Sequence, residues 1–143
     1  MVCGLFFVGL WLNARCHLGH NIVPGIIPEG TLLYHGANSE TIPQGIEWAA
    51  LDFEHAHIYC RQRTFLSSSQ RGCWQLTLTT TRPLKVVYFD GFSAANIPGP
   101  LDTQDLLAFG ESLSNPERML DETERGKALC RWGRNVSVDG FVR

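Results

Sequence analysis

The sequence has little charge, and charges of one sign do not cluster in it. Charged residues make up 18% of the 143 residues, and the formal net charge is -2. The nearest approach to a basic patch follows a run of acidic residues and consists of Arg125, Lys127, Arg131 and Arg134. Nucleic-acid-binding proteins present clustered lysine and arginine side chains. We therefore expect no nucleic-acid partner.

Long hydrophobic runs are also missing. The first twelve residues, MVCGLFFVGLWL, carry no charge, but a membrane-spanning helix needs about 20 apolar residues. We therefore expect no stable membrane span. The run has the length of the hydrophobic part of a signal peptide, yet no lysine or arginine precedes it, and Asn13-Ala14-Arg15 is a poor cleavage site. Residues 1–20 are thus a buried strand, a signal peptide or the product of a misplaced gene start.

The cysteine count favours an oxidising compartment. The sequence has five cysteines, and four remain if the apolar run with Cys3 is removed, an even number that fits two disulfides. Asn135-Val136-Ser137 would be a glycosylation site in a secreted protein. We expect secretion, with a cytoplasmic protein of reduced thiols as the alternative. Cys60 and Cys73 flank a serine-rich loop and are the pair considered for a disulfide, against two separate buried thiols.

The pattern of elements predicts one α+β domain. The length suits a single domain with its own core, and there is no internal repeat. We expect residues 21–30 to form a loop, Asp52 to cap a helix and Gly133 to end one. Short mixed or antiparallel strands are expected over 31–35, 73–81, 84–89 and 136–142, and helices over 52–63, 102–109 and 116–132.

Three side chains could form a pocket for a nucleotide. His35 ends the apolar segment LLYH, and Trp48 stands eleven residues before Tyr59. Two aromatic rings across a cleft suit a flat heteroaromatic ligand, and a histidine can bond a ribose hydroxyl. The alternative is that both rings belong to the core and that the histidine is structural.

These segments resemble a known fold. "LLYHG", a loop, an aromatic residue before alanine and an "A-x-x-Y-C" helix resemble the first half of the ADP-ribosyltransferase fold, in its poly(ADP-ribose) polymerase-like branch. The resemblance implies that residues 21–143 form a glycosyltransferase domain that binds NAD as substrate. His35-Gly36 would hold the NAD ribose, Tyr59 would stack on nicotinamide, and Trp48 would replace a tyrosine of the family. That replacement keeps the stacking but loses a hydroxyl.

A second resemblance covers more of the chain. The segments "GTLLYHG", "RPL", "YFDG", "DTQDL" and "DGFVR" are similar to those of a family of uncharacterised fungal proteins. This similarity extends over residues 28–143 and implies no activity.

The glutamate that ADP-ribosyltransferases use has no match in the sequence, so no catalytic residue is assigned. Asp102, Gln104 and Asp105 lie at an expected helix start, and Asp139 lies in an expected turn. The glutamate would lie beyond residue 143 if the chain is truncated at its C-terminus. The two functions that remain are NAD cleavage, as glycohydrolase or ADP-ribosyl transfer, and a non-catalytic binding domain.

Metal ligation is not expected. Cysteine and histidine occur together at residues 16–20 and 55–60, but neither group has the spacing of a zinc finger.

Overall fold

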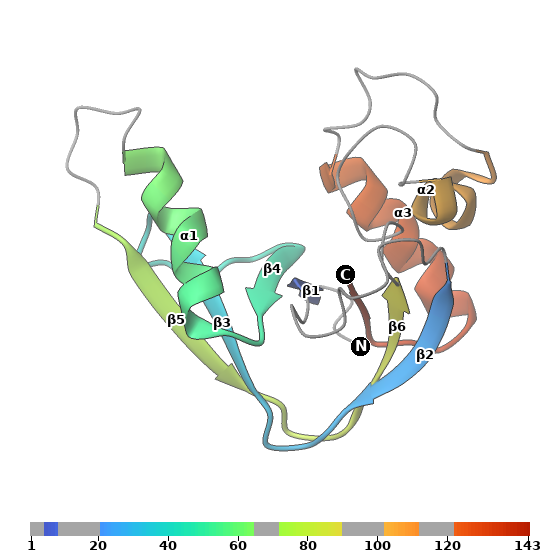
Figure 1. Ribbon diagram of the computed structural model, residues 1–143, viewed down its shortest axis with the longest axis horizontal. Helices are drawn as coiled ribbons and strands as arrows, with labels where there is room; N and C mark the ends of the chain where they lie inside the picture. Colours follow the sequence, from blue (N-terminus) through green and yellow to red (C-terminus); the bar gives the residue numbers. More distant parts are fainter. Residues whose placement is uncertain (1–4, 9–20, 65–71, 90–101, 112–121) are drawn as a thin grey trace.

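The described part of the chain forms seven strands and three helices in a computed structural model of the protein (Figure 1). The structure describes residues 5–8, 21–64, 72–89, 102–111 and 122–143. The strands are β1 (Leu5–Val8), β2 (Ile22–Ile27), β3 (Leu32–Ala37), β4 (Glu47–Ala50), β5 (Trp74–Thr79), β6 (Leu84–Phe89) and β7 (Gly140–Val142). The helices are α1 (Phe53–Thr64), α2 (Asp102–Phe109) and α3 (Glu122–Asn135). The expected α+β class is confirmed.

The sheet consists of two halves joined by β1. Its strand order is β2-β6-β7-β1-β4-β3-β5. β1 pairs in parallel with β7 on one side and with β4 on the other. The outer pairs, β2–β6 and β3–β5, are antiparallel. Figure 1 shows α1 beside the half that holds β3, β4 and β5, and α2 and α3 beside the half that holds β2, β6 and β7.

The same two halves are joined at their base by a bent two-stranded ribbon. The β2–β3 and β5–β6 links run side by side, as the lower part of Figure 1 shows. Gly30 N donates to Thr80 O at 2.9 Å, and Thr80 N donates to Thr31 O at 3.1 Å. The buried Thr80 hydroxyl donates to Pro28 O at 2.7 Å and accepts from Thr31 N at 2.9 Å. Gly30 has a φ of 79°, which few other residues adopt without strain. The ribbon is therefore hydrogen-bonded through its bend.

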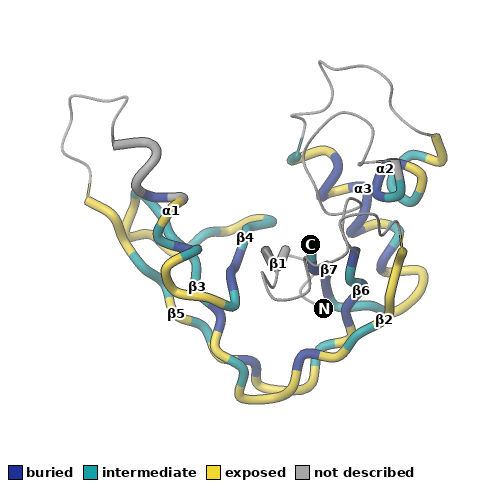
Figure 2. Tube along the Cα trace, in the orientation of Figure 1, coloured by how far each residue is buried: buried dark blue, intermediate teal, exposed yellow. Residues whose placement is uncertain are grey.

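Two groups of buried side chains form the core. Because successive residues of a strand point to opposite faces, Val86 and Val87 of β6 lie in different groups. The first group is Ile27, Leu33, Ala49, Val86 and Val142, and the second is Val87, Phe89, Leu129 and Phe141. Burying one such side chain contributes about 1.5–3 kcal/mol. Figure 2 shows the buried stretches on β4, β6, β7 and α3.

A buried ionic cluster fastens α2, α3 and the residue after β7 together. Arg125 is 2% exposed, and its Nε donates to Asp105 Oδ1 at 2.8 Å. Its Nη1 donates to Glu122 Oε1 at 2.6 Å. Arg143 pairs with the other oxygen of Glu122 and donates to Gln104 Oε1 at 3.2 Å. Removing one of these partners would leave the buried guanidinium group without part of its compensation and would destabilise the fold.

The expectation that residues 21–30 form a loop was wrong, because β2 occupies most of them. Pro24 and Gly25 suggest a loop, but β2 is an edge strand and pairs only with β6. A proline is tolerated on an edge strand because one side of that strand needs no N–H donors.

The expected end of the last helix was also wrong. α3 continues through Gly133 to Asn135. A Cβ on Gly133 would lie 2.9 Å from the Val138 side chain and 3.1 Å from that of Phe141. Gly133 therefore allows β7 to approach the helix instead of ending it. The turn that follows, with Ser137 at a φ of 57°, delays β7 to residue 140.

Candidate functional site

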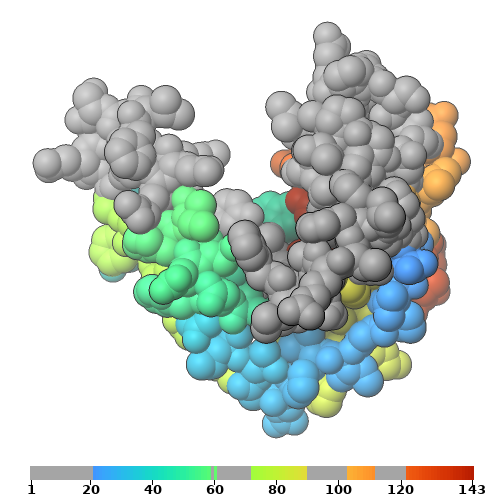
Figure 3. Space-filling model, viewed as in Figure 1, coloured from blue at the N-terminus to red at the C-terminus, as the bar shows by residue number. Residues whose placement is uncertain are grey.

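A cleft opens where β3 and β4 part. The two strands share one paired position, Tyr34 with Ala50. Beyond it lies a cleft of about 540 Å³, lined by the end of β3, the following loop, β4 and Ala56 of α1. We call it the β3–β4 cleft. His35, Gly36 and Trp48 are among its lining residues, so the structure brings together three of the four residues that the sequence suggested. Figure 3 shows the atoms of α1 on the left side of the molecule and those of β2 on the right.

His35 is hydrogen-bonded to the backbone of β4. Its Nδ1 lies 2.5 Å from the carbonyl oxygen of Trp48. A carbonyl oxygen can only accept, so Nδ1 carries the hydrogen. In the neutral imidazole Nε2 is then the acceptor, and it lies 4.0 Å from a carboxylate oxygen of Glu47. In a neutral ring this hydrogen bond leaves Nε2 as an acceptor for a hydroxyl group, and in a charged ring Nε2 faces Glu47 as a donor.

Gly36 is required by the packing of α1 on β3. A Cβ at this position would lie 2.2 Å from the backbone oxygen of Ala56 and 3.1 Å from its carbonyl carbon. Real atoms do not approach so closely, so only glycine allows this strand–helix distance. The His-Gly pair therefore has a structural explanation for Gly36 in addition to its place in the cleft.

Trp48 contributes to two regions at once. It lines the β3–β4 cleft, but it also packs against the second core group. The guanidinium carbon of Arg143 lies 4.1 Å from the centroid of a Trp48 ring, so a cation–π contact covers one ring face. Tyr59 lies on α1, and its side chain is outside the described residues.

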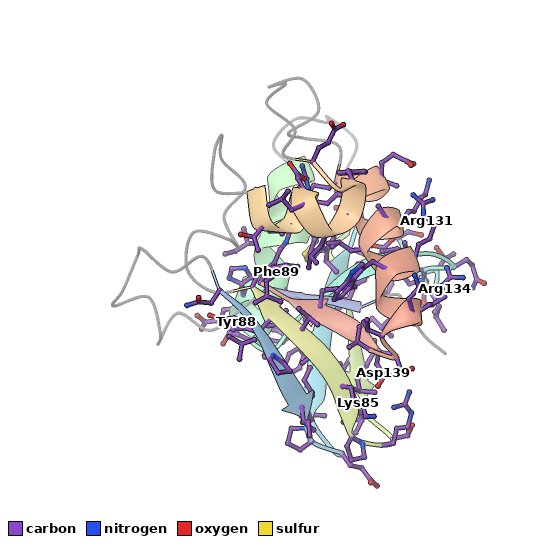
Figure 4. All side chains as sticks on the ribbon, turned by 90° about the vertical axis from the view of Figure 1, so that its right-hand side faces the viewer. Lys85, Tyr88, Phe89, Arg131, Arg134 and Asp139 are labelled. Carbon is purple, nitrogen blue, oxygen red and sulfur yellow. A yellow bond between two sulfur atoms is a disulfide. The ribbon has the colours of Figure 1, made fainter. Side chains whose placement is uncertain are left out.

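The acids considered from the sequence are bound to basic partners. Asp105 is paired with Arg125, and Asp139 accepts from both terminal nitrogens of Arg82 at 2.6 and 2.9 Å. Asp139 also accepts from the Lys85 backbone N at 2.9 Å, and Figure 4 shows these two residues side by side. The hydrogen bonds from Arg82, followed by that from Lys85 N, hold the pKa of Asp139 below its usual 3.8.

The other two candidates have no described role in the cleft either. Gln104 is fully buried and accepts from Arg143. Asp102 is the first residue of α2, and its side chain lies outside the described residues.

Two polar residues of the cleft were missed in the sequence. Glu47 begins β4, and its side chain is 42% exposed. Asn38 follows β3, and its Oδ1 is buried with no hydrogen-bond partner among the described residues. Glu47 directly precedes Trp48, which was already a candidate site residue, so the sequence did indicate this part of the chain. Nothing local marks Asn38, because its position depends on the parting of β3 and β4.

The disulfide between Cys60 and Cys73 is confirmed. The two Cα atoms are 5.2 Å apart, and the bond ties α1 to the segment before β5. Cys130 is also disulfide-bonded, with a partner outside the described residues. Among the described residues, no helix has the length and apolar character needed to cross a membrane.

The part of the chain that forms the cleft is similar to a known protein family. Residues 15–74 match the YPL277C N-terminal domain family. The matched range contains His35, Gly36, Trp48 and both cysteines of the Cys60–Cys73 bridge.

Two full-length relatives from Saccharomyces cerevisiae extend the similarity. The uncharacterized proteins YOR389W and YPL277C are each 28% identical to the chain over 88% of its length. The chain spans 26% of YOR389W and 34% of YPL277C, about a quarter to a third of these relatives. No solved structure matches the chain. The similarity to a fungal family is thus confirmed, and the names of these relatives state no activity.

Proposed function

We propose that the β3–β4 cleft binds NAD or a related nucleotide, and that residues 21–143 form an ADP-ribosyltransferase-like domain. The observation that carries the proposal is the parting of β3 and β4 after one paired position, with His35 held at the opening by the Trp48 carbonyl. A cleft of about 540 Å³ is within the usual size of a small-molecule site.

The cleft offers suitable partners for a ribose. In its neutral form His35 accepts a hydroxyl hydrogen at Nε2, and Asn38 is a second polar residue of the lining. Glu47 is the carboxylate nearest to His35. In NAD the bond between nicotinamide and ribose is the reactive one, and its cleavage builds positive charge on the ribose. A carboxylate at the position of Glu47 would stabilise that charge.

A non-catalytic binding domain is the second candidate. It is favoured because Asp105 and Asp139 form ion pairs with arginines and lie outside the cleft lining. Glu47, which is 42% exposed, is less preorganised than a buried catalytic acid. We therefore expect nucleotide binding with little or no release of nicotinamide by this chain. Robust release would establish catalysis, and Glu47→Gln would then test its origin.

We also propose that the form with these disulfides occurs in an oxidising compartment, as in a secreted protein. The support is that Cys60, Cys73 and Cys130 are all disulfide-bonded. Structural disulfides are rare in the cytosol of mesophiles. Alkylation of protein from the growth medium and from the cell, without reduction, distinguishes secretion from the cytoplasmic alternative.

Calorimetric titration with NAD tests the binding site. Replacing His35 by alanine removes one hydrogen bond worth about 0.5–1.5 kcal/mol, so the Kd should rise roughly 2- to 12-fold. Tyr59→Ala should weaken binding by about 1 kcal/mol if that ring stacks on nicotinamide. His55→Ala, on the same helix as Tyr59 but outside the cleft lining, is the matched control. Folded wild-type protein that binds no NAD would refute the assignment of the ligand.

A further inference from the structure

Three sulfur and nitrogen donors meet where α1 lies beside the segment before β5. His57 and Cys60 are three residues apart on α1, so they share a helix face. The Nδ1 of His57 lies 3.3 Å from Cys73 Sγ and 3.7 Å from Cys60 Sγ. All three donor atoms lie within 4.8 Å of one another. We call His57, Cys60 and Cys73 the Cys₂His cluster.

The two nitrogen–sulfur distances fit the ligands of one tetrahedral zinc ion. Zinc–sulfur bonds of about 2.3 Å and zinc–nitrogen bonds of about 2.0 Å place nitrogen and sulfur ligands about 3.5 Å apart. The two nitrogen–sulfur distances, 3.3 and 3.7 Å, lie on either side of this value. The two sulfurs of such a site would be about 3.8 Å apart, so only the disulfide has to open.

Neighbouring residues orient the imidazole ring of His57 and hold Cys60 in place. Phe53, one turn earlier on α1, stacks on the His57 ring with centroids 6.3 Å apart and planes 10° apart. Cys60 is fully buried, and the close packing of α1 on β3 at Gly36 holds its part of the helix in place. Two of the three ligands are therefore positioned before any metal binds, which lowers the ordering entropy that binding requires.

We propose that the Cys₂His cluster is a redox-controlled site for zinc, separate from the β3–β4 cleft. In the oxidised protein both sulfurs are bonded to each other in the Cys60–Cys73 disulfide and cannot bind a metal as thiolates. A low-molecular-weight thiol opens it: two RSH supply two electrons and two protons, become RSSR, and leave two cysteine thiols. One Zn²⁺ then binds both sulfurs and His57 Nδ1, and the two thiol protons are released to solvent. The fourth tetrahedral position is left to water.

The donor types select the ion. Two thiolates and one imidazole favour a thiophilic ion such as zinc over magnesium or calcium, which prefer oxygen ligands. The cluster contains no carboxylate. The oxidised and metal-bound forms exclude each other because the same sulfur atoms serve both.

The test is metal titration of the full chain before and after reduction. Protein reduced with a phosphine, which is then removed, is titrated with Co²⁺, and Zn²⁺ is added to displace it. We expect thiolate-to-cobalt charge-transfer absorption that Zn²⁺ abolishes, and none in oxidised protein. His57→Ala and Cys73→Ser should each weaken binding at this site by roughly a hundredfold or more, since each removes one of three protein ligands. His55→Ala, two residues away on α1, should bind as wild type does.

A second measurement separates this cluster from the other cysteines, which reduction also exposes. Zn²⁺ should protect Cys60 and Cys73 from alkylation in mass spectrometry, and circular dichroism should show the native spectrum of the reduced, metal-bound chain. Absence of binding to reduced wild-type protein would overturn the proposal. So would binding that survives His57→Ala and is lost instead when His17 and His20 are replaced, because the metal would then sit at residues 16–20.

Discussion

Replacing Gly36 by alanine should destabilise the protein through one contact. The new Cβ would stand 2.2 Å from the Ala56 carbonyl oxygen, which is backbone and cannot rotate away. To reach an ordinary contact, α1 must move from β3 by about 1 Å. The helix is held by the Cys60–Cys73 bridge near one end, and at the other by Asp52, whose side chain accepts from His55 N at 2.8 Å.

The magnitude follows from two opposing effects. Overpacking of this kind costs about 1–3 kcal/mol, and the rigid backbone contact places Gly36→Ala near the upper end. Alanine also restricts the unfolded chain more than glycine does, which raises the free energy of unfolding by about 0.4–1 kcal/mol. The net loss should be about 2 kcal/mol, which lowers the Tm of a protein of this size by about 5–10 °C.

Gly45→Ala is the matched control for thermal and urea unfolding. A Cβ at Gly45 meets no atom within 4 Å, and its φ lies outside the left-handed region. This variant should unfold at or slightly above the wild-type temperature. If Gly36→Ala and Gly45→Ala had the same Tm, the strand–helix contact would not be as close as the structure has it, and the explanation of Gly36 would fail.

Three further substitutions test the bridge and the two ion pairs. Cys73→Ser should lower the free energy of unfolding of the oxidised protein by about 3 kcal/mol, measured with urea. If wild type and variant still differed by this amount after reduction, the loss of the cross-link would not be the cause. Asp105→Asn removes a carboxylate from the buried Arg125 and should cost about 3 kcal/mol; a loss under about 1 kcal/mol would mean that Arg125 finds other partners. Asp139→Asn should lower the Tm at neutral pH. Because Arg82 lowers the pKa of Asp139 below 3.8, the stabilisation is present above that pH and is lost as the pH falls through the lower value. A difference in Tm that did not shrink in acid would rule out the charge as its source.

Local signals were enough to locate several elements. β6 and α2 span the expected residues 84–89 and 102–109, because an apolar β-branched run and an acidic helix start are both local features. The cap by Asp52 is confirmed for the same reason. β2 was missed because its stability comes from pairing with β6, which no local pattern around Pro24 reveals.

The site was only partly predictable. His35 could be placed on a strand from the sequence, although β3 continues past it to Ala37, and the disulfide could be considered from the loop between its cysteines. The separation of β3 from β4 could not be predicted, because it depends on strands far apart in the chain. The place of Asn38 in the cleft and the contact between Arg143 and Trp48 also have no signal in the sequence, because both depend on how distant segments pack.

The central position of β1 has a consequence for how the protein assembles in time. β1 precedes the other described strands in the chain, yet it pairs with β4 on one side and on the other with β7, the last of them. During synthesis one edge of β1 therefore stays unpaired after α1 and the β3–β5 half have been made. Contacts between such distant segments form slowly, and exposed strand edges invite pairing with other chains. The half with β6, α2 and α3 can close on β1 only at the end, so the step that joins the two halves of the sheet should be the slow step of folding.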